Sequence, residues 1–181
     1  MSKVELYVLA NPQFTPDDLA WLKSIRAEYC PEDQTNLPPH ITLAFSLPAV
    51  LADSVRAELQ EMARQTAAFD VFLNRLFHEP ASRADPRHYL FLKPGPGSAR
   101  VTNLHESLAK HIPQIRNCLL KPFDPHLTIG IFADEAACEA AMDGIEASFK
   151  PICGRIVMLS LLEWPGDRIL AEIPLIGRSS L

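Results

Sequence analysis

Two copies of a short motif, 86 positions apart, contain the residues of this chain best suited to acid–base chemistry. Each copy is His, apolar, Thr, apolar after a proline: Pro39 precedes His40-Ile41-Thr42-Leu43, and Pro125 precedes His126-Leu127-Thr128-Ile129. Alternate residues of a β-strand share a face, so each His and Thr should point one way and the apolar residues the other. One copy alone would most often be a hydrogen-bonded histidine on a half-buried strand, but two copies favour a site.

The same alternation predicts what lies beyond each motif. Ala44 and Gly130 should follow the threonines on the polar face, and Phe45 and Ile131 should continue the apolar face. A strand face that carries imidazole, hydroxyl and then empty space is suited to receive a ligand. We therefore expect a cleft between the two motif strands.

Two histidines that converge on one site can act as general acid and general base. An unperturbed pKa near 6.5 lets histidine hold either role at neutral pH. The hydroxyls of Thr42 and Thr128 can donate to the non-bridging oxygens of a phosphate. Two histidines without further ligands make a poor metal site, and the nearest acid in the sequence, Asp124, precedes a proline in an expected loop. We expect no metal and no cofactor.

A repeated order of elements should position the motifs. Strand, helix, motif strand, helix and strand occur twice, at an offset of roughly 83–86 positions, and such repetition is a signal at the level of the fold. The expected strands are 4–10, 40–46, 69–77, 89–93, 126–132, 152–163 and 168–176, and the expected helices run from Thr15 to about 30, over 51–62, over 101–112 and from Asp134 to about 149.

This order predicts a duplicated, bilobal α+β fold. It should have two antiparallel or mixed sheets, flanking helices and a central cleft that carries both His-x-Thr motifs. Residues 1–181 should form a single two-lobed domain, with repeat halves of roughly 1–80 and 87–178.

Composition narrows the partners. The 181 residues are 48% hydrophobic, enough for a full core, and carry a net charge of −5, which argues against a broad footprint on duplex DNA. A single phosphate, a nucleotide or an RNA end remains possible. The start of the chain has no basic leader, and no apolar run is long enough to span a membrane. We expect a cytoplasmic monomer with no membrane partner.

The four cysteines, Cys30, Cys118, Cys138 and Cys153, form no C-x-x-C pair and no metal-ligand spacing. Buried, reduced thiols are the expected state. The segment between His78 and Arg87 should be a solvated connection, although it could close over the cleft and supply positive charge.

Other side chains have structural interpretations. His105 and His111 lie six residues apart on an expected helix and should be exposed. Tyr7, Tyr89 and Phe45 could stack on a base, but we expect them to pack in the core.

With these motifs the chain resembles the two-histidine phosphoesterase superfamily, in the branch of RNA 2′,3′-cyclic phosphodiesterases and 2′-5′ RNA ligases. That family has two His-hydrophobic-Thr-hydrophobic motifs on facing strands of a duplicated bilobal α+β fold, and the resemblance covers nearly the whole chain. It implies that His40 and His126 are the acid–base pair and that Thr42 and Thr128 bind phosphate. Many ligase-like members carry an arginine shortly after the second motif, where this chain has Gly130-Ile131-Phe132.

Three functions follow from these features. The first is metal-independent hydrolysis of a 2′,3′-cyclic phosphate, with an RNA terminus or a small cyclic nucleotide as partner. The second is 2′-5′ RNA ligation, the reverse reaction, which an acidic surface disfavours because two polynucleotide ends must be held. The third is a non-catalytic nucleotide-binding module, which would not need two proton-transfer groups.

Overall fold

The structure, a computed structural model, describes residues 4–30, 37–115 and 122–178. Their elements, in chain order, are β1 (Glu5–Gln13), α1 (Pro16–Tyr29), β2 (Ile41–Pro48), the 3₁₀ turn η1 (Ala49–Leu51), α3 (Ala52–Gln65), β3 (Phe69–Glu79), β4 (His88–Pro94), α4 (Ser98–His111), β5 (Leu127–Phe132), α6 (Glu135–Glu146), β6 (Ile152–Trp164) and β7 (Arg168–Pro174). This is the expected α+β class. No helix within these ranges is long and apolar enough to cross a membrane.

The expected helix starts at Thr15 and Asp134 are confirmed, and both residues cap their helices. The Thr15 side chain accepts a hydrogen bond from the Asp18 amide, and Pro16 occupies the first turn of α1. The Asp134 side chain accepts one from the Ala137 amide at the start of α6. These caps satisfy amides that a helix leaves without an internal partner.

The seven strands form one antiparallel sheet. Its order is β2-β1-β6-β3-β4-β5. β7 pairs with the C-terminal part of β6, from Met158 to Glu163. We expected two sheets, but pairing from Phe69 opposite Ile156 to Leu73 opposite Ile152 joins β3 to β6. The two groups of strands are therefore parts of one continuous sheet.

The strand order relates the two halves by an approximate two-fold axis between β3 and β6. β1, β2 and β3 of the first half match β4, β5 and β6 of the second in chain order. Each third strand pairs with the first strand of the other half, β6 with β1 and β3 with β4. Val71 and Gly154, 83 positions apart, face each other at the centre of the β3–β6 ladder. The halves have thus exchanged their third strands.

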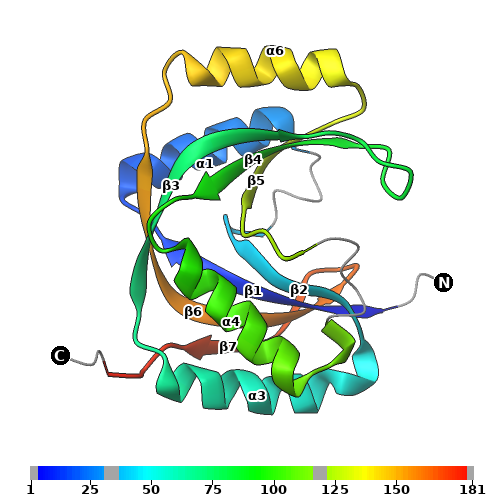
Figure 1. The fold of residues 1–181 in the computed structure, drawn as a ribbon, viewed down its shortest axis with the longest axis vertical. Coiled ribbons are helices and arrows are strands. Elements are labelled where there is room, and N and C mark those ends of the chain that lie inside the picture. Colours follow the sequence, from blue (N-terminus) through cyan, green and yellow to red (C-terminus); the bar gives the residue numbers. More distant parts are fainter. Residues whose placement is uncertain (1–3, 31–36, 116–121, 179–181) are drawn as a thin grey trace.

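The helices lie at the two ends of the molecule (Figure 1). α1 and α6 lie with β3, β4 and β5 at one end, and α3 and α4 lie with β2, β6 and β7 at the other. α1, from the first half, packs on β5, the motif strand of the second. A Cβ added at Gly130 would lie 3.2 Å from the Tyr29 Cβ and 2.6 Å from the Phe132 ring, so the glycine allows this close approach.

The cysteines are only partly as expected. Cys138 is buried, whereas Cys30 and Cys153 are partly exposed. Cys118 lies outside the described residues. The expected loop between the first helix and the first motif also falls largely on residues 31–36, which the structure does not describe.

Candidate active site

His40 and His126 make the same hydrogen bond. Each histidine immediately precedes a strand, β2 or β5. The Nδ1 of His40 lies 2.8 Å from the Pro38 carbonyl oxygen, and that of His126 lies 2.7 Å from the Asp124 carbonyl oxygen. A carbonyl can only accept, so Nδ1 donates in both cases. In the neutral ring, Nε2 is then the nitrogen that accepts a proton.

A β-bulge follows the threonine in each motif. Leu43 is the extra residue in β2, and Ile129 is the extra residue in β5. The flanking pairs are Leu9 opposite Thr42 and Val8 opposite Ala44 in the first lobe, and Phe91 opposite Thr128 and Leu90 opposite Gly130 in the second. A bulge places two residues opposite one and changes the faces of the residues beyond it.

The bulges overturn the expected alternation beyond the threonines. Ala44 and Gly130 are buried and lie opposite core residues, so they do not extend the polar face. Ile131 instead lines the cleft, and the Phe45 ring lies 6.2 Å from the ring of Tyr7, a cleft residue. The sequence offered one signal, because a glycine within a strand often marks a bulge.

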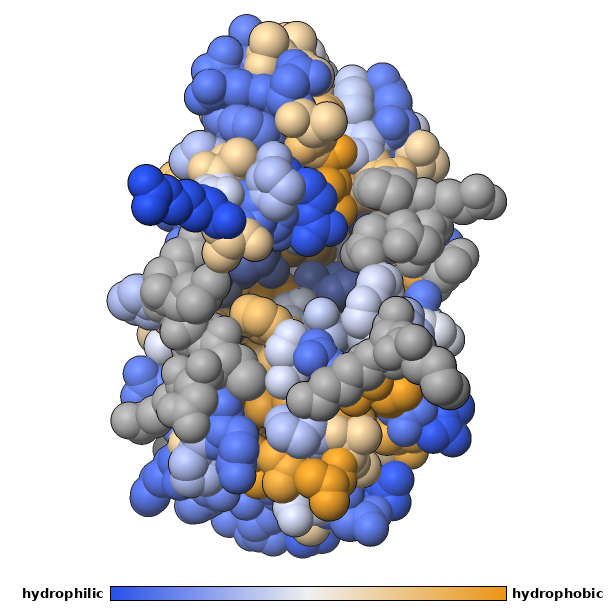
Figure 2. All heavy atoms as spheres, turned by 90° about the vertical axis from the view of Figure 1, so that its right-hand side faces the viewer, coloured by the Kyte–Doolittle hydropathy of each residue, from blue (hydrophilic) through white to orange (hydrophobic). Residues whose placement is uncertain are grey.

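A cleft of about 240 Å³ is lined by His40, Thr42 and Thr128 together. Figure 2, which shows the right-hand side of Figure 1 face on, shows a hollow in the surface between the two ends of the molecule. His126, two residues before Thr128, lies close enough for its charge to act on the pKa of His40. The four residues singled out in the sequence therefore gather in one region.

Two aromatic side chains that we expected in the core, Tyr7 and Tyr89, line the cleft instead. They occupy matching positions on β1 and β4, and Trp164 lines the cleft with them. The ring of Phe91 stacks on that of His126, with centroids 3.8 Å apart. Phe91 could not be predicted as a site residue from the sequence, because its partner in the stack is remote in the chain.

Burial keeps His40 neutral. It lowers the pKa of His40 to about 4, against the opposing effect of the hydrogen bond to the Pro38 carbonyl, and the positive charges of Arg26 and His126 lower this pKa further. At neutral pH the imidazole is uncharged, and its Nε2 can take a proton.

Arg26 is a cleft residue that the sequence analysis did not single out. It is only 7% exposed and lies on the buried face of α1, four residues after Leu22. Its Nη1 donates to the Leu37 carbonyl at 3.0 Å. The available signal was spacing, because residues four apart lie on one face of a helix and Arg26 therefore shares the face of Leu22.

Arg87, the residue immediately before β4, also lines the cleft. Its Nε and Nη2 each donate to the Asp85 carboxylate at 2.8 Å, and the Tyr89 hydroxyl donates to the same carboxylate at 2.6 Å. These hydrogen bonds, those from Arg87 foremost, hold the pKa of Asp85 well below its usual range. The segment between His78 and Arg87 is therefore not simply solvated as expected, because Asp85 near its end accepts hydrogen bonds from two residues that line the cleft.

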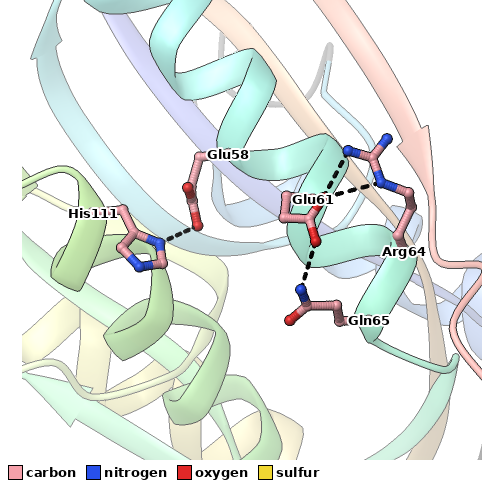
Figure 3. Close-up of polar contacts among 5 residues, drawn as sticks. All are labelled: Glu58, Glu61, Arg64, Gln65 and His111. Carbon is pink, nitrogen blue, oxygen red and sulfur yellow. Dashed lines mark hydrogen bonds and ion pairs between the residues drawn. The ribbon is translucent and has the colours of Figure 1, made fainter.

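His105 is buried, so the expectation of an exposed residue was wrong. Its Nδ1 lies 2.8 Å from the carbonyl oxygen of Leu43, the extra residue of the β2 bulge, and its ring stacks on Phe123 at 4.0 Å. His105 thus supplies a partner for a carbonyl outside the regular ladder. His111 does lie at the surface, where it pairs with Glu58 of α3 (Figure 3).

Within the described ranges, one group of three side chains could hold a metal ion. The ligand atoms of His78, Glu135 and Glu139 lie within 4.8 Å of one another, and none of the three lines the cleft. His78 also hydrogen-bonds His88 at 3.0 Å. Both glutamates lie on α6, and Glu135 is in its first turn, where an acidic side chain also interacts favourably with the helix dipole.

Comparisons with known proteins agree on the fold. A family model described as the 2′-5′ RNA ligase superfamily matches residues 14–168. TT0787 of Thermus thermophilus is 19% identical, with 96% of this chain and 99% of that chain covered and a TM-score of 0.63.

Two further solved structures are similar. Kluyveromyces marxianus Usb1 is 11% identical, with 96% and 98% of the two chains covered and a TM-score of 0.59. Escherichia coli LigT complexed with 3′-AMP is 16% identical, with 97% of each chain covered and a TM-score of 0.57. No curated protein sequence matches the chain.

Proposed function

The chain belongs to the 2′-5′ RNA ligase superfamily, and from this membership and its two histidines we propose that it hydrolyses a 2′,3′-cyclic phosphate at an RNA end or on a small nucleotide. The observation that carries the proposal is the identical Nδ1–carbonyl hydrogen bond of His40 and His126. Two imidazoles held in the same tautomer beside two threonine hydroxyls form an acid–base site for a phosphate.

In this proposal His40 is the general base and His126 the general acid. The neutral His40 takes a proton from water through Nε2 as the water oxygen bonds to phosphorus. The bond from phosphorus to one ribose oxygen breaks, and protonated His126 gives that oxygen its proton. The ring opens to a phosphomonoester, and at the end of the step His40 has gained one proton and His126 has lost one. Thr42 and Thr128 donate to the non-bridging oxygens, where negative charge sits. This residue set requires no metal.

The cleft is small, with a volume of about 240 Å³ against roughly 300–1,000 Å³ for typical ligand sites. This size suits the end of a nucleic acid or a small nucleotide. Arg26 supplies positive charge although the chain has no arginine directly after the second motif, and Arg87 lines the cleft as an ion pair with Asp85. Tyr7, Tyr89 and Trp164 offer aromatic surface to a base. The structure of LigT with 3′-AMP supports a nucleotide ligand by analogy.

The test is a panel of cyclic nucleotides and oligonucleotides ending in a cyclic phosphate, assayed with EDTA. We expect hydrolysis to persist in EDTA, and His40→Ala or His126→Ala to reduce kcat/KM by about 100-fold or more. His111→Ala, which changes an exposed histidine outside the cleft, is the matched control. Loss of activity in EDTA, or near-normal turnover by either cleft variant, would contradict the assignment.

Ligation is a second candidate, favoured by the description of the matching family. The same groups could activate a 5′-hydroxyl end in place of water: His40 would take the hydroxyl proton as the 5′-oxygen bonds to phosphorus, the bond from phosphorus to the ribose 3′-oxygen would break, and His126 would protonate that oxygen. An RNA with a cyclic phosphate and a second RNA with a 5′-hydroxyl, incubated together, distinguish the two. A 2′-5′ linked product would support ligation, whereas a phosphomonoester alone supports hydrolysis.

A further inference from the structure

Arg26 and Lys93 are the two arginine or lysine side chains that the structure buries within residues 4–30, 37–115 and 122–178, at 7% and 5% exposure. Burying a charge is costly unless the charge is paired or hydrogen-bonded. Both cations contact the short segments that lead into the two motif histidines. Because each cation contacts a different one of these two segments, the pair calls for a common explanation.

Lys93 holds the segment before His126. It lies at the end of β4, and its Nζ makes an ion pair with the Asp124 carboxylate at 2.5 Å and lies 3.3 Å from the centre of the Phe77 ring. The Asp124 carbonyl oxygen is the acceptor for His126 Nδ1. The side chain of Asp124 is thus fixed by a buried cation, and its backbone fixes the histidine.

Arg26 holds the segment before His40 in a comparable way. Its Nη1 donates to the carbonyl oxygen of Leu37, and the next residue, Pro38, carries the carbonyl that accepts from His40 Nδ1. Arg26 comes from α1, which packs on β5. Arg26, which holds the segment before the first motif, therefore extends from a helix that packs on the strand of the second motif.

We propose that Arg26 and Lys93 are positioning residues, which hold His40 and His126 in the Nδ1–H tautomer by fixing the segments that carry the accepting carbonyls. The hydrogen bond at one ring nitrogen decides which nitrogen of a neutral histidine bears the proton. If the carbonyl moves away, Nε2 can keep the proton and can no longer accept one. The effect on turnover rests on the proposed function, but the effect on the tautomer does not.

The two cations allow a crossed experiment. Ring ¹⁵N NMR reports the tautomer of each histidine, in Lys93→Met and in Arg26→Met, without any substrate. We expect Lys93→Met to shift His126 toward the Nε2–H form and leave His40 unchanged, and Arg26→Met to do the reverse. Arg155→Gln, which removes an exposed ion pair with Asp70 on the same sheet, is the control and should change neither histidine.

Turnover provides the second measurement. In metal sites, loss of a group that orients a ligand side chain costs about 10- to 100-fold in activity. Lys93 would orient His126 in a similar way, so Lys93→Met should lower kcat by this order with KM nearly unchanged. Lys93→Arg retains the charge and should restore most of kcat and of the wild-type ¹⁵N spectrum.

Two results would overturn the inference. One is that Lys93→Met and Arg26→Met both fold and that both histidines keep their wild-type tautomers in each variant. The other is that each variant disturbs both histidines equally, which would indicate general loosening of the cleft. If Lys93→Met does not fold, Asp124→Asn tests the same ion pair from its half-exposed end, and an unchanged His126 there would also refute the proposal. A wild-type protein that hydrolyses no cyclic phosphate would refute the proposed function alone.

Discussion

Phe91 stacks on His126 with an angle of 22° between the rings, whereas Leu9 occupies the matching position beside the other motif. Phe91 lies opposite Thr128 across β4 and β5, and Leu9 lies opposite Thr42 across β1 and β2. The duplicated lobes thus give the two histidines different surroundings. An aromatic face favours a cation, which suits His126 as the acid.

The first prediction concerns this stack. Phe91→Leu should lower kcat/KM by about 2- to 5-fold, because a cation–π interaction contributes about 0.5–1 kcal/mol at a partly exposed site. Steady-state kinetics on a cyclic nucleotide measure the effect. Phe72→Leu, at an exposed phenylalanine of β3, is the control and should leave kcat/KM unchanged. An equal loss in both variants would remove any specific role for the stack.

The second prediction concerns the acidic limb of the pH profile. A general base must be neutral, and the pKa of His40 is lowered to about 4. kcat/KM should therefore hold steady as pH falls below the ordinary histidine range and decline only as pH approaches about 4. Rates from pH 3.5 to 9, with stability checked at each pH, test this. A decline centred near 6.5 would show that the pKa of the general base is not lowered.

The third prediction concerns stability in acid. The pKa of His40 is lower in the folded state than in the unfolded chain, so the unfolded chain binds the proton first as pH falls. The free energy of unfolding should decrease between about pH 6.5 and pH 4, by at most about 3 kcal/mol from this group. Urea unfolding across this range should show a shallower decrease for His40→Gln than for the wild type. His111→Gln should retain the wild-type slope; identical slopes in all three proteins would contradict the prediction.

The fourth prediction concerns the bulge in β2. His105→Phe keeps a flat ring against Phe123 but leaves the buried Leu43 carbonyl without its donor. The free energy of unfolding should drop by about 1–3 kcal/mol, the cost of an unsatisfied buried polar group. Urea unfolding at pH 7 measures it, with His111→Phe as the surface control. A change below a few tenths of a kcal/mol would mean that the hydrogen bond is not important for stability.

The fifth prediction concerns the phosphate donors. Thr42→Val and Thr128→Val keep the side-chain shape but remove the hydroxyl. Each should lower kcat/KM by about 10- to 150-fold, because a hydrogen bond to a charged group contributes about 1.5–3 kcal/mol. Crystals soaked in sulfate should show the anion between the two hydroxyls. An anion bound elsewhere, with full activity in both variants, would return the threonines to a structural role.

The motif residues could be predicted from the sequence because their chemistry is local. His, Thr and a preceding proline lie within four positions, and their repetition marks them out. The order of strands and helices followed from hydrophobic periodicity and caps such as Thr15. These features need no knowledge of tertiary contacts.

What the sequence did not predict depends on tertiary contacts. The bulges at Leu43 and Ile129 are defined only by pairing with β1 and β4. Arg26 acts on a segment 11 residues away, and Lys93 pairs with a residue 31 positions away. No spacing rule connects such pairs, so the residues that support the histidines became visible only in the structure.

The exchange of third strands between the halves has an evolutionary consequence. A single ancestral half would have lacked the strand that covers the edge of its first strand, and two copies could have supplied it to each other as a domain-swapped homodimer. Joining the copies end to end would then have produced one chain without changing the sheet, and freed each copy to diverge. On this view, the different neighbours of the two motifs, Leu9 beside one and Phe91 beside the other, would have arisen after the fusion.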